Sequence, residues 1–261
     1  MSSEVRHRVD HEQAYPLVQL TGVLDADTES DVRAVLLEAL SEGPEALVVD
    51  VSELEPGTPD APKALRKVRQ DTADWPAANL VLSDPRVHGP WRDTGWPVWP
   101  DIGAAFADLG PPDHEHRLSL ELEPLVGAAR RTRELITEAC GRWDLPDLAG
   151  PARIVATEMV NNVVAHALTP MVVLLAVHGD GMSVAVRDSS DVIPTYTGGP
   201  VPPTAYGGRG MLLIDSVAAR WGNLALGTGK VVWALLESEE PPSRPARELP
   251  GGASMAGPPR G

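Results

Sequence analysis

The first hundred residues alternate short apolar runs with amphipathic segments, a pattern that predicts strands separated by helices. Residues 1–13 are expected to begin an edge strand, and residues 22–27 are expected to turn the chain. The other predicted elements are strands at 15–21, 46–51 and 79–83 and a helix at about 28–42 capped by Asp27 or Thr28. A proline-rich loop is predicted at 55–62, followed by a helix that runs to about Ala73. This alternation predicts a small α/β layer structure.

A second group of elements follows residues 111–116, which we predict to be a linker because they are rich in proline and polar side chains. We therefore expect one domain over residues 1–110 and a second over 117–240. The second is predicted to contain strands at 117–123, 171–177, 182–188 and 230–236, and helices from Pro124 to about Trp143, at about 150–167 and at 211–221. Gly179-Asp-Gly181 predicts a hairpin between the middle two strands. Residues 241–261, rich in proline and glycine, are predicted to be disordered.

Net charge, cysteine count and the lengths of the apolar runs exclude several classes of function. A formal net charge of −15 argues against a nucleic-acid-binding protein, which would need a basic face. The single cysteine, Cys140, excludes an internal disulfide and a cysteine-based zinc cluster, and its apolar neighbours predict a core position. The chain opens with no charged-then-apolar leader, and no apolar run reaches the roughly 18 residues of a membrane span. We expect a soluble cytoplasmic protein with no membrane partner.

Glu158, Asn162 and His166 recur every four residues within an otherwise apolar helical segment. Four residues advance an α-helix by slightly more than one turn, so the three side chains are predicted to share one stripe. Asn161 would point about 100° away from that stripe. The stripe is either the solvated edge of a core helix or a set of functional groups, and this segment alone does not distinguish the two.

Four segments of the first domain resemble the STAS domain of anti-sigma factor antagonists, over about residues 5–110. They are Gly22-Val-Leu-Asp25, Val48-Val-Asp-Val-Ser52, Leu80-Val-Leu-Ser83 and a closing helix at 102–109. In that family a serine after the second segment is phosphorylated, and Asp60 stands about where it would be. The resemblance therefore implies either a degenerate domain that has lost the switch or a fixed carboxylate that partly imitates phosphoserine.

Two further clusters carry competing interpretations. Trp91, Trp96 and Trp99 are expected to pack locally, although an exposed tryptophan patch would indicate a partner site. His114 and His116 have no carboxylate or cysteine partner at a fixed spacing, so we interpret them as solvated linker residues rather than metal ligands.

The order of motifs in the second domain resembles the GHKL (Bergerat) ATPase fold, and within it the anti-sigma factor serine kinases. The motifs are the Glu158-Asn162-His166 helix, a strand that ends in Asp188, the turn Gly207-Gly-Arg-Gly210 and a closing Gly229-Lys230 strand. The resemblance implies a fold of α/β and α+β type, a STAS-like α/β domain followed by a GHKL α/β sandwich. It covers about residues 115–240 and implies ATP and Mg²⁺ as cofactors.

The resemblance also assigns a role to each polar residue. Asn162 would hold Mg²⁺ through its side-chain carbonyl, and Glu158 would accept a proton from the attacking hydroxyl unless it is only a structural carboxylate near the metal. His166 would lie near the ribose or phosphates unless it is merely buried, and Asp188 would accept from the adenine amine unless it only forms an Asx turn. Gly208 and Gly210 would let backbone N–H groups approach phosphate, with Arg209 as a further contact or a solvated residue.

Two departures from the family pattern affect the base pocket. The Asp-x-Gly-x-Gly box reads Asp188-Ser-Ser-Asp-Val192, without either glycine. The closing strand's Gly-Thr corresponds either to Gly227-Thr228, slightly early, or to Gly229-Lys230 with the hydroxyl lost. Lys230 is then a nucleotide contact or a strand-edge lysine, and we favour the strand-edge lysine.

We therefore expect an ATP-dependent serine/threonine kinase of the anti-sigma-factor type. Its implied substrate is a STAS-domain anti-sigma factor antagonist, and the resemblance allows a sigma factor as sequestered partner and a homodimer. One alternative is a nucleotide-gated binding module without phosphoryl transfer, and another is a scaffold with an inactive pocket. A sensor histidine kinase is disfavoured because no long two-helix phosphoacceptor region precedes the ATPase segment.

Overall fold

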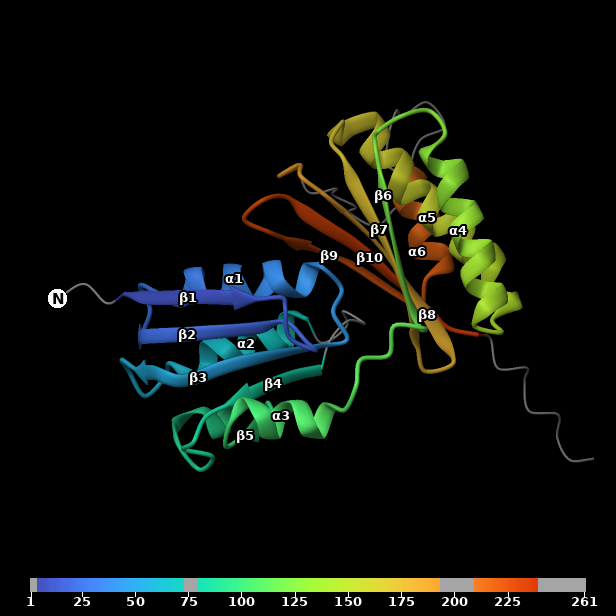
Figure 1. Cartoon of the computed structure of the whole chain (residues 1–261). Helices are drawn as coiled ribbons and strands as arrows, with labels where there is room; N and C mark the ends of the chain where they lie inside the picture. The colour runs from blue at the N-terminus through green and yellow to red at the C-terminus, as the bar shows by residue number, and fades with distance from the viewer. Residues whose placement is uncertain (1–3, 73–78, 193–208, 239–261) are drawn as a thin grey trace, which may run out of the picture.

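The computed structural model describes residues 4–72, 79–192 and 209–238, and it contains two five-stranded sheets, each with its own helices (Figure 1). We call the part built on the first sheet the first domain and the part built on the second sheet the second domain. The first domain comprises β1 (Val5–Asp10), β2 (Leu17–Leu24), α1 (Glu29–Ser41), β3 (Ala46–Pro56), α2 (Pro62–Asp71), β4 (Asn79–Ser83), η1 (Pro90–Thr94), β5 (Val98–Trp99) and α3 (Ile102–Leu109).

The first sheet has the order β1-β2-β3-β4-β5, with β1 antiparallel to β2 and the other pairs parallel. Helices α1 and α2 cover one face, where a large cluster includes Leu36, Leu65 and Trp91, and α3 covers the other. Parallel strands buried on both faces read as continuous apolar runs, which is why residues 46–51 were recognisable as a strand. The α/β layer prediction for this domain is confirmed, while its assignment to the STAS family stays a prediction.

The turn predicted at residues 22–27 is wrong at its start, because β2 continues through Gly22 to Leu24. Gly22 has a φ of +109°, and a Cβ at this position would lie 2.1 Å from the carbonyl oxygen of Glu4, the residue just before β1. Only glycine fits so close to another backbone, so this residue marks a close approach within the sheet rather than a turn.

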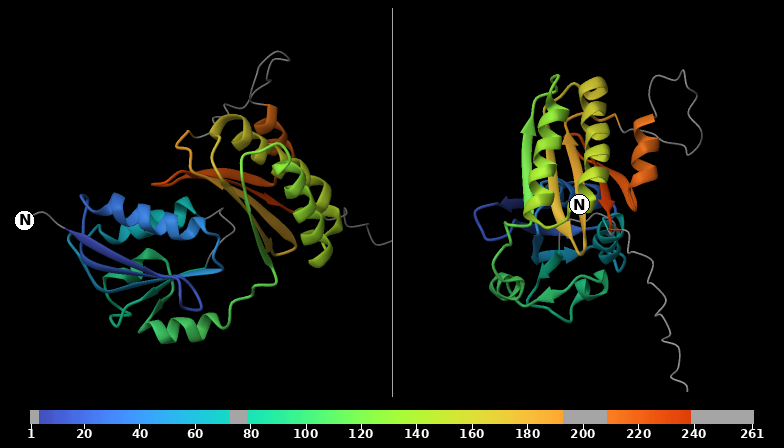
Figure 2. Two further views of the ribbon diagram at one scale, coloured as in Figure 1. Left: turned by 45° about the horizontal axis from the view of Figure 1, so that its top comes forward. Right: turned by 90° about the vertical axis from the view of Figure 1, so that its right-hand side faces the viewer.

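The second domain comprises β6 (Arg117–Leu122), α4 (Ala128–Arg142), η2 (Pro146–Leu148), α5 (Ala149–Asn162), η3 (Val163–Ala167), β7 (Met171–His178), β8 (Gly181–Asp188), α6 (Arg209–Val217), β9 (Arg220–Ala225) and β10 (Lys230–Leu236). Its strands lie in the order β6-β7-β8-β10-β9, all antiparallel. Figure 2 shows the three helices side by side over one face of this sheet, with α5 in the middle. This is an α/β sandwich, as predicted.

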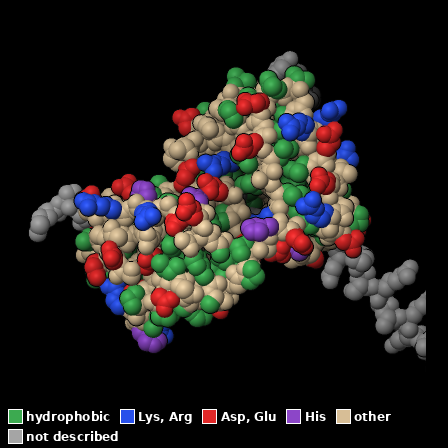
Figure 3. Space-filling model, in the orientation of Figure 1, with side chains coloured by type: hydrophobic (Ala, Val, Ile, Leu, Met, Phe, Trp, Pro, Cys, Tyr) green, Lys and Arg blue, Asp and Glu red, His purple; other side chains and the backbone are tan. Residues whose placement is uncertain are grey.

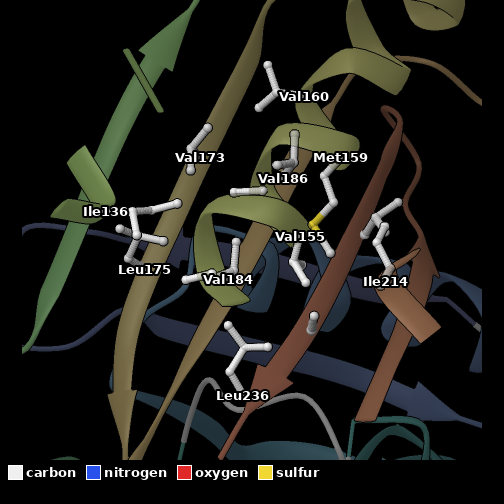
Figure 4. Packing of buried hydrophobic residues seen from close by; sticks show 14 of the residues in the cluster. Ile136, Val155, Met159, Val160, Val173, Leu175, Val184, Val186, Ile214 and Leu236 are labelled. Carbon is white, nitrogen blue, oxygen red and sulfur yellow. The ribbon is translucent and has the colours of Figure 1, made fainter. Parts of the chain in front are cut away.

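The core of the second domain lies between α5 and the sheet (Figure 4). Val155 and Met159 of α5 face Val184 and Val186 of β8, and Ile214 of α6 closes one side. Cys140 is part of this cluster, and burial raises the pKa of its thiol. The prediction that Cys140 is a core residue is therefore confirmed.

The start of α4 and the end of α6 differ from the predictions, and the second domain contains one strand that was not predicted. Helix α4 begins at Ala128 rather than Pro124, because Gly127 adopts a left-handed φ of +118°. Helix α6 ends at Val217, and residues 220–225 form a strand, β9, that the sequence did not reveal. Strand β9 depends on a tertiary contact, since a Cβ on Gly222 would lie 2.9 Å from the indole of Trp233 in β10.

Several surface and loop residues that the sequence singled out now have defined surroundings. Trp91 and Trp96 are buried, which confirms that they pack locally. His116 is exposed and lies beside Asp113, with its ring Nδ1 2.5 Å from a carboxylate oxygen. Asp60 is exposed and pairs with Lys63, so its two interpretations remain open.

Acidic side chains are spread over both domains in Figure 3. Among the described helices, none combines the length and hydropathy needed to cross a membrane. The predicted disordered tail, residues 241–261, lies outside the described residues.

The outer face of the second sheet, opposite its helices, contacts α1 of the first domain (Figure 1). The Glu38 carboxylate accepts from Arg187 in β8 at 3.0 Å and from the hydroxyl of Thr228 at 2.8 Å. Arg117 donates to the carbonyl oxygen of Gly43, and Leu174 packs against the same glycine. The predicted boundaries at residues 110 and 117 stay a prediction, but the two parts of the chain are in direct contact.

We expect Glu38→Gln to lower the free energy of unfolding by roughly 1 kcal/mol, because it weakens two hydrogen bonds made to one carboxylate between the domains. Urea denaturation measures this change. Glu134→Gln is the matched control, since Glu134 forms an exposed pair with Arg130 within one helix. Equal effects of the two substitutions would show that the contact through Glu38 contributes no more than a surface ion pair.

Candidate functional site

Glu158 and Asn162 lie one turn apart near the end of α5, and both side chains are half-buried. They face the start of α6, where Gly210 is the second helical residue. A Cβ on Gly210 would lie 2.7 Å from Oε2 of Glu158 and 3.6 Å from Oδ1 of Asn162. The lack of a side chain at this glycine therefore allows the α6 backbone to approach a carboxylate and an amide together.

The amide of Asn162 is held by a weak contact, with Nδ2 3.8 Å from the sulfur of Met211. This contact uses the nitrogen and leaves the carbonyl oxygen on the side of Gly210. Asn161 is exposed, in agreement with its predicted position off the stripe. The asparagine whose oxygen could serve as a ligand for a hard cation is thus Asn162.

His166 departs from the predicted stripe because the helix changes its geometry. Residues 163–167 form a π-helical turn, in which hydrogen bonds run from i to i+5, and a spacing of four residues no longer completes a turn. His166 is exposed in this turn, and the chain leaves the helix at Leu168 with a left-handed φ of +57°. Its contact with a nucleotide stays a prediction.

Asp188, the last residue of β8, is buried and its two carboxylate oxygens have different surroundings. Oδ1 accepts from the backbone N–H of Ser190 and from Nζ of Lys230, both at 2.8 Å. Oδ2 is buried and has no hydrogen-bond partner among the described residues. The Asx turn considered from the sequence is therefore present, and it uses one oxygen while the other remains available to an incoming donor.

Lys230 is not the strand-edge lysine that we favoured from the sequence. It is 6% exposed, and its ammonium group binds Asp188 and the carbonyl oxygen of Ser190 at 3.2 Å. The register of the sheet causes this contact, because Lys230 in β10 lies directly opposite Asp188 in β8. The sequence showed both residues but could not show that they face each other.

The alternation of side chains in β8 and β10 places the Asp188–Lys230 pair on the helix-covered face of the sheet. Val184 and Val186, which point the same way as Asp188, belong to the core under α5, as does Val232 two residues beyond Lys230. Glu158 and Asn162 of α5 lie in the helix layer over this face. Arg187 points to the opposite face, where it meets Glu38.

A cavity of about 790 Å³ borders Asp188, Met171 and Gly127 at one end of the sheet. Neither Glu158 nor Asn162 borders this cavity. The predicted common pocket for a whole nucleotide therefore stays a prediction.

Gly229 keeps the end of β8 close to the start of β10. It has a φ of +152°, and a Cβ at this position would lie 2.0 Å from the carbonyl oxygen of Asp188. Any side chain here would push the two strands apart next to the Asp188–Lys230 pair. The glycine noticed in the sequence thus has a structural role at this site.

Two of the predicted phosphate-binding residues lie at or beyond the limit of the described residues. Gly208 lies outside them, as do residues 193–207. Arg209 is described as the first residue of α6, and its side chain is outside the described part. The predicted phosphate contacts of these two residues stay predictions.

Comparison with protein families identifies this part of the chain. Residues 122–234 match the family model described as a histidine kinase-like ATPase domain. The second domain is a histidine kinase-like ATPase domain. The match begins at the end of β6 and ends within β10, so this ATPase domain includes Glu158, Asn162, Asp188 and Lys230. It implies that the domain binds ATP.

Two solved structures resemble parts of the chain. One contains the RsbU and RsbW domains of a Mycobacterium tuberculosis protein, with 16% sequence identity over 50% of this chain and 34% of that chain, at a TM-score of 0.37. The other is an anti-sigma factor antagonist from Mycobacterium paratuberculosis, with 21% identity over 40% of this chain and 93% of that chain, at a TM-score of 0.34. A search of curated protein sequences finds no match. The identification of the ATPase domain depends on the family match alone.

Proposed function

We propose that the ATPase domain is an Mg-ATP-dependent serine/threonine protein kinase of the anti-sigma-factor type. The observation that carries the proposal is the close approach of Gly210 to Glu158 and Asn162, which brings a carboxylate, an amide oxygen and a helix N-terminus to one place. A helix N-terminus favours phosphate, and an amide oxygen suits Mg²⁺. A structural helix edge would have no need for a glycine that lets α6 approach these two polar groups.

The polar groups of this chain fit ATP at its two ends. At the base end, the buried and unpartnered Oδ2 of Asp188 is an acceptor that the exocyclic amine of adenine can satisfy. At the phosphate end, Asn162 would hold Mg²⁺ with its side-chain oxygen, and the backbone N–H groups at the start of α6 would bind phosphate oxygens. When bound, Mg-ATP supplies the phosphoryl group to be transferred.

The proposed proton acceptor is Glu158. Its carboxylate Oε2 lies against Gly210, next to the amide oxygen of Asn162. A carboxylate beside the transferring phosphoryl group can accept the proton of an attacking hydroxyl and orient it. We propose this role for Glu158, with a serine or threonine of a partner protein as the attacking group.

The proposed substrate is a STAS-domain anti-sigma factor antagonist, with a sigma factor as the sequestered partner. Both follow from the resemblance of the motifs, and the residues of the site do not name either protein. The STAS-like sequence of the first domain supports a regulator that acts on proteins of this class. The proposal extends to a homodimer and a cytoplasmic location.

A second function is favoured by one observation. Arg187, next to Asp188 in β8, is bound to Glu38 of the first domain. Nucleotide binding at Asp188 could therefore change the contact between the domains without any phosphoryl transfer. In this alternative, the protein is a nucleotide-gated binding module.

Two experiments separate these functions. Calorimetry with Mg-ATP tests binding, and absence of binding would leave only a scaffold. Incubation with γ-labelled ATP and STAS proteins encoded by the same genome tests transfer, and label on a partner serine or threonine supports the kinase. Binding without transfer supports the gated module, while label on Ser52 or Thr58 of this chain would indicate an internal switch.

Gly210→Ala is expected to lower phosphoryl transfer by roughly tenfold to a hundredfold. The added Cβ would lie 2.7 Å from Oε2 of Glu158, so the carboxylate would have to move away from its present position. Stability should change by less than about 1 kcal/mol, since alanine favours the helix and Glu158 is flexible. Gly150→Ala in α5 is the matched control, because no atom lies within 4 Å of a Cβ there. Equal transfer by the two variants would argue against a role for the Gly210 approach.

A further inference from the structure

The Asp188–Lys230 pair places a donor and an acceptor side by side in a buried position. Lys230 Nζ binds Oδ1 of Asp188 at 2.8 Å and the carbonyl oxygen of Ser190 at 3.2 Å. An ammonium group has three N–H donors, so one remains after these two contacts among the described residues. Oδ2 of Asp188 is the matching acceptor without a partner.

We propose that Lys230 is a specificity-determining residue that makes this site accept guanine and hypoxanthine nucleotides as well as adenine nucleotides. This inference rests on the proposed nucleotide-binding function. Where adenine places its amine, a carboxylate without a neighbouring cation favours adenine, because guanine would present its O6 carbonyl there as a second acceptor. The ammonium group of Lys230 removes that conflict by donating to an acceptor on the base.

The edges of all three purine bases carry the required pattern. Adenine presents N7 as an acceptor next to the N6 amine as a donor. Guanine and hypoxanthine present O6 as an acceptor next to N1–H as a donor. Each base can therefore place its donor on Asp188 Oδ2 and its acceptor on Lys230, with a shift of about one atom along the base edge. Guanine and hypoxanthine depend on the lysine, because without it their O6 would face the carboxylate unpaired. Adenine depends on it less, because its amine carries two N–H donors and can satisfy the carboxylate by itself.

The positions of both groups are fixed by the fold. Lys230 and Asp188 are opposite residues of paired strands, and the side chains are 7% and 1% exposed. The Ser190 N–H holds Oδ1 in the Asx turn, which keeps Oδ2 from rotating into its place. A site with buried and fixed polar groups discriminates between ligands by whether each group finds a partner.

Calorimetric titration of the full chain with Mg-ATP, Mg-GTP and Mg-ITP tests the proposal. We expect the dissociation constants of the three nucleotides to agree within about tenfold, since each base satisfies both groups. ITP lacks the 2-amino group of guanine, so similar binding of ITP and GTP would place recognition at O6 and N1. Rejection of GTP and ITP by more than a hundredfold, with ATP still bound, would overturn this inference alone.

The variants Lys230→Met and Lys230→Arg extend the test. Methionine removes the donor and should weaken GTP and ITP by roughly tenfold or more relative to ATP, whereas arginine keeps a donor and should preserve their binding. Equal weakening of ATP and GTP by Lys230→Met would overturn the inference, and a melting curve establishes that each variant is folded. The comparison of ATP, GTP and ITP on the wild-type protein tests the inference even if both variants fail to fold. If the wild-type protein binds none of the three nucleotides, the proposed function itself fails.

Discussion

Replacing Glu158 with glutamine is expected to lower phosphoryl transfer by roughly 10²–10⁴-fold, because glutamine keeps the size of the side chain but cannot accept a proton. ATP affinity should change by less than about tenfold, since Glu158 is not assigned to either end of the nucleotide. Initial rates with γ-labelled ATP and a STAS partner measure transfer, and calorimetry measures binding. A lower rate with unchanged binding is the signature of a group that acts in the transition state.

The matched control is Glu138→Gln. Glu138 is on the neighbouring helix α4, where it forms an exposed pair with Arg142, far in sequence from the polar stripe. Its replacement should leave both transfer and binding unchanged. If Glu158→Gln transferred phosphate at the wild-type rate, Glu158 would be a structural carboxylate and the kinase mechanism would need another base.

The largest effect on stability is expected for Lys230→Met, which should lower the free energy of unfolding by roughly 3–5 kcal/mol. The reason is that Asp188 would keep a buried negative charge with no cation beside it, and the side chains of this pair are only 7% and 1% exposed. Urea denaturation monitored by circular dichroism measures the change, with the slope checked to show that the transition remains two-state.

The double variant Lys230→Met with Asp188→Asn separates the ion pair from simple loss of packing. Removing both charges should recover most of the lost stability, because the cost of an uncompensated buried charge disappears. Lys63→Met provides the surface comparison, since Lys63 pairs with Asp60 at the same distance of 2.8 Å while both side chains are exposed. A loss below about 1 kcal/mol in Lys230→Met would mean that water reaches the pair.

The contact between α1 and the outer sheet face suggests how the first domain could influence the site. Consecutive residues of β8 point to opposite faces, so Arg187 binds Glu38 on one side while Asp188 binds Lys230 on the other. A change in the position of α1 would act on the backbone that carries Asp188. This connection makes the nucleotide-gated alternative testable, because Glu38→Gln should alter ATP affinity only if the two faces are coupled.

The sequence by itself determined most elements and the common helix side of two candidate site residues. Strands β4 and β10 and helix α3 have the predicted bounds, because each is a continuous apolar or amphipathic run with clear ends. The spacing of Glu158 and Asn162 predicted their common side of a helix, since both lie within its regular α-helical part. These features depend on local periodicity, which a sequence carries directly.

Only the tertiary structure decided the features that depend on contacts between distant residues. Strand β9 exists because Gly222 leaves room for Trp233 of the adjacent strand, and its mixed sequence has no strand periodicity of its own. The ion pair of Lys230 follows from the register between β8 and β10, which places it opposite a residue 42 positions away. Side-chain burial and pairing of this kind are set by how the strands align, and local sequence patterns do not contain that information.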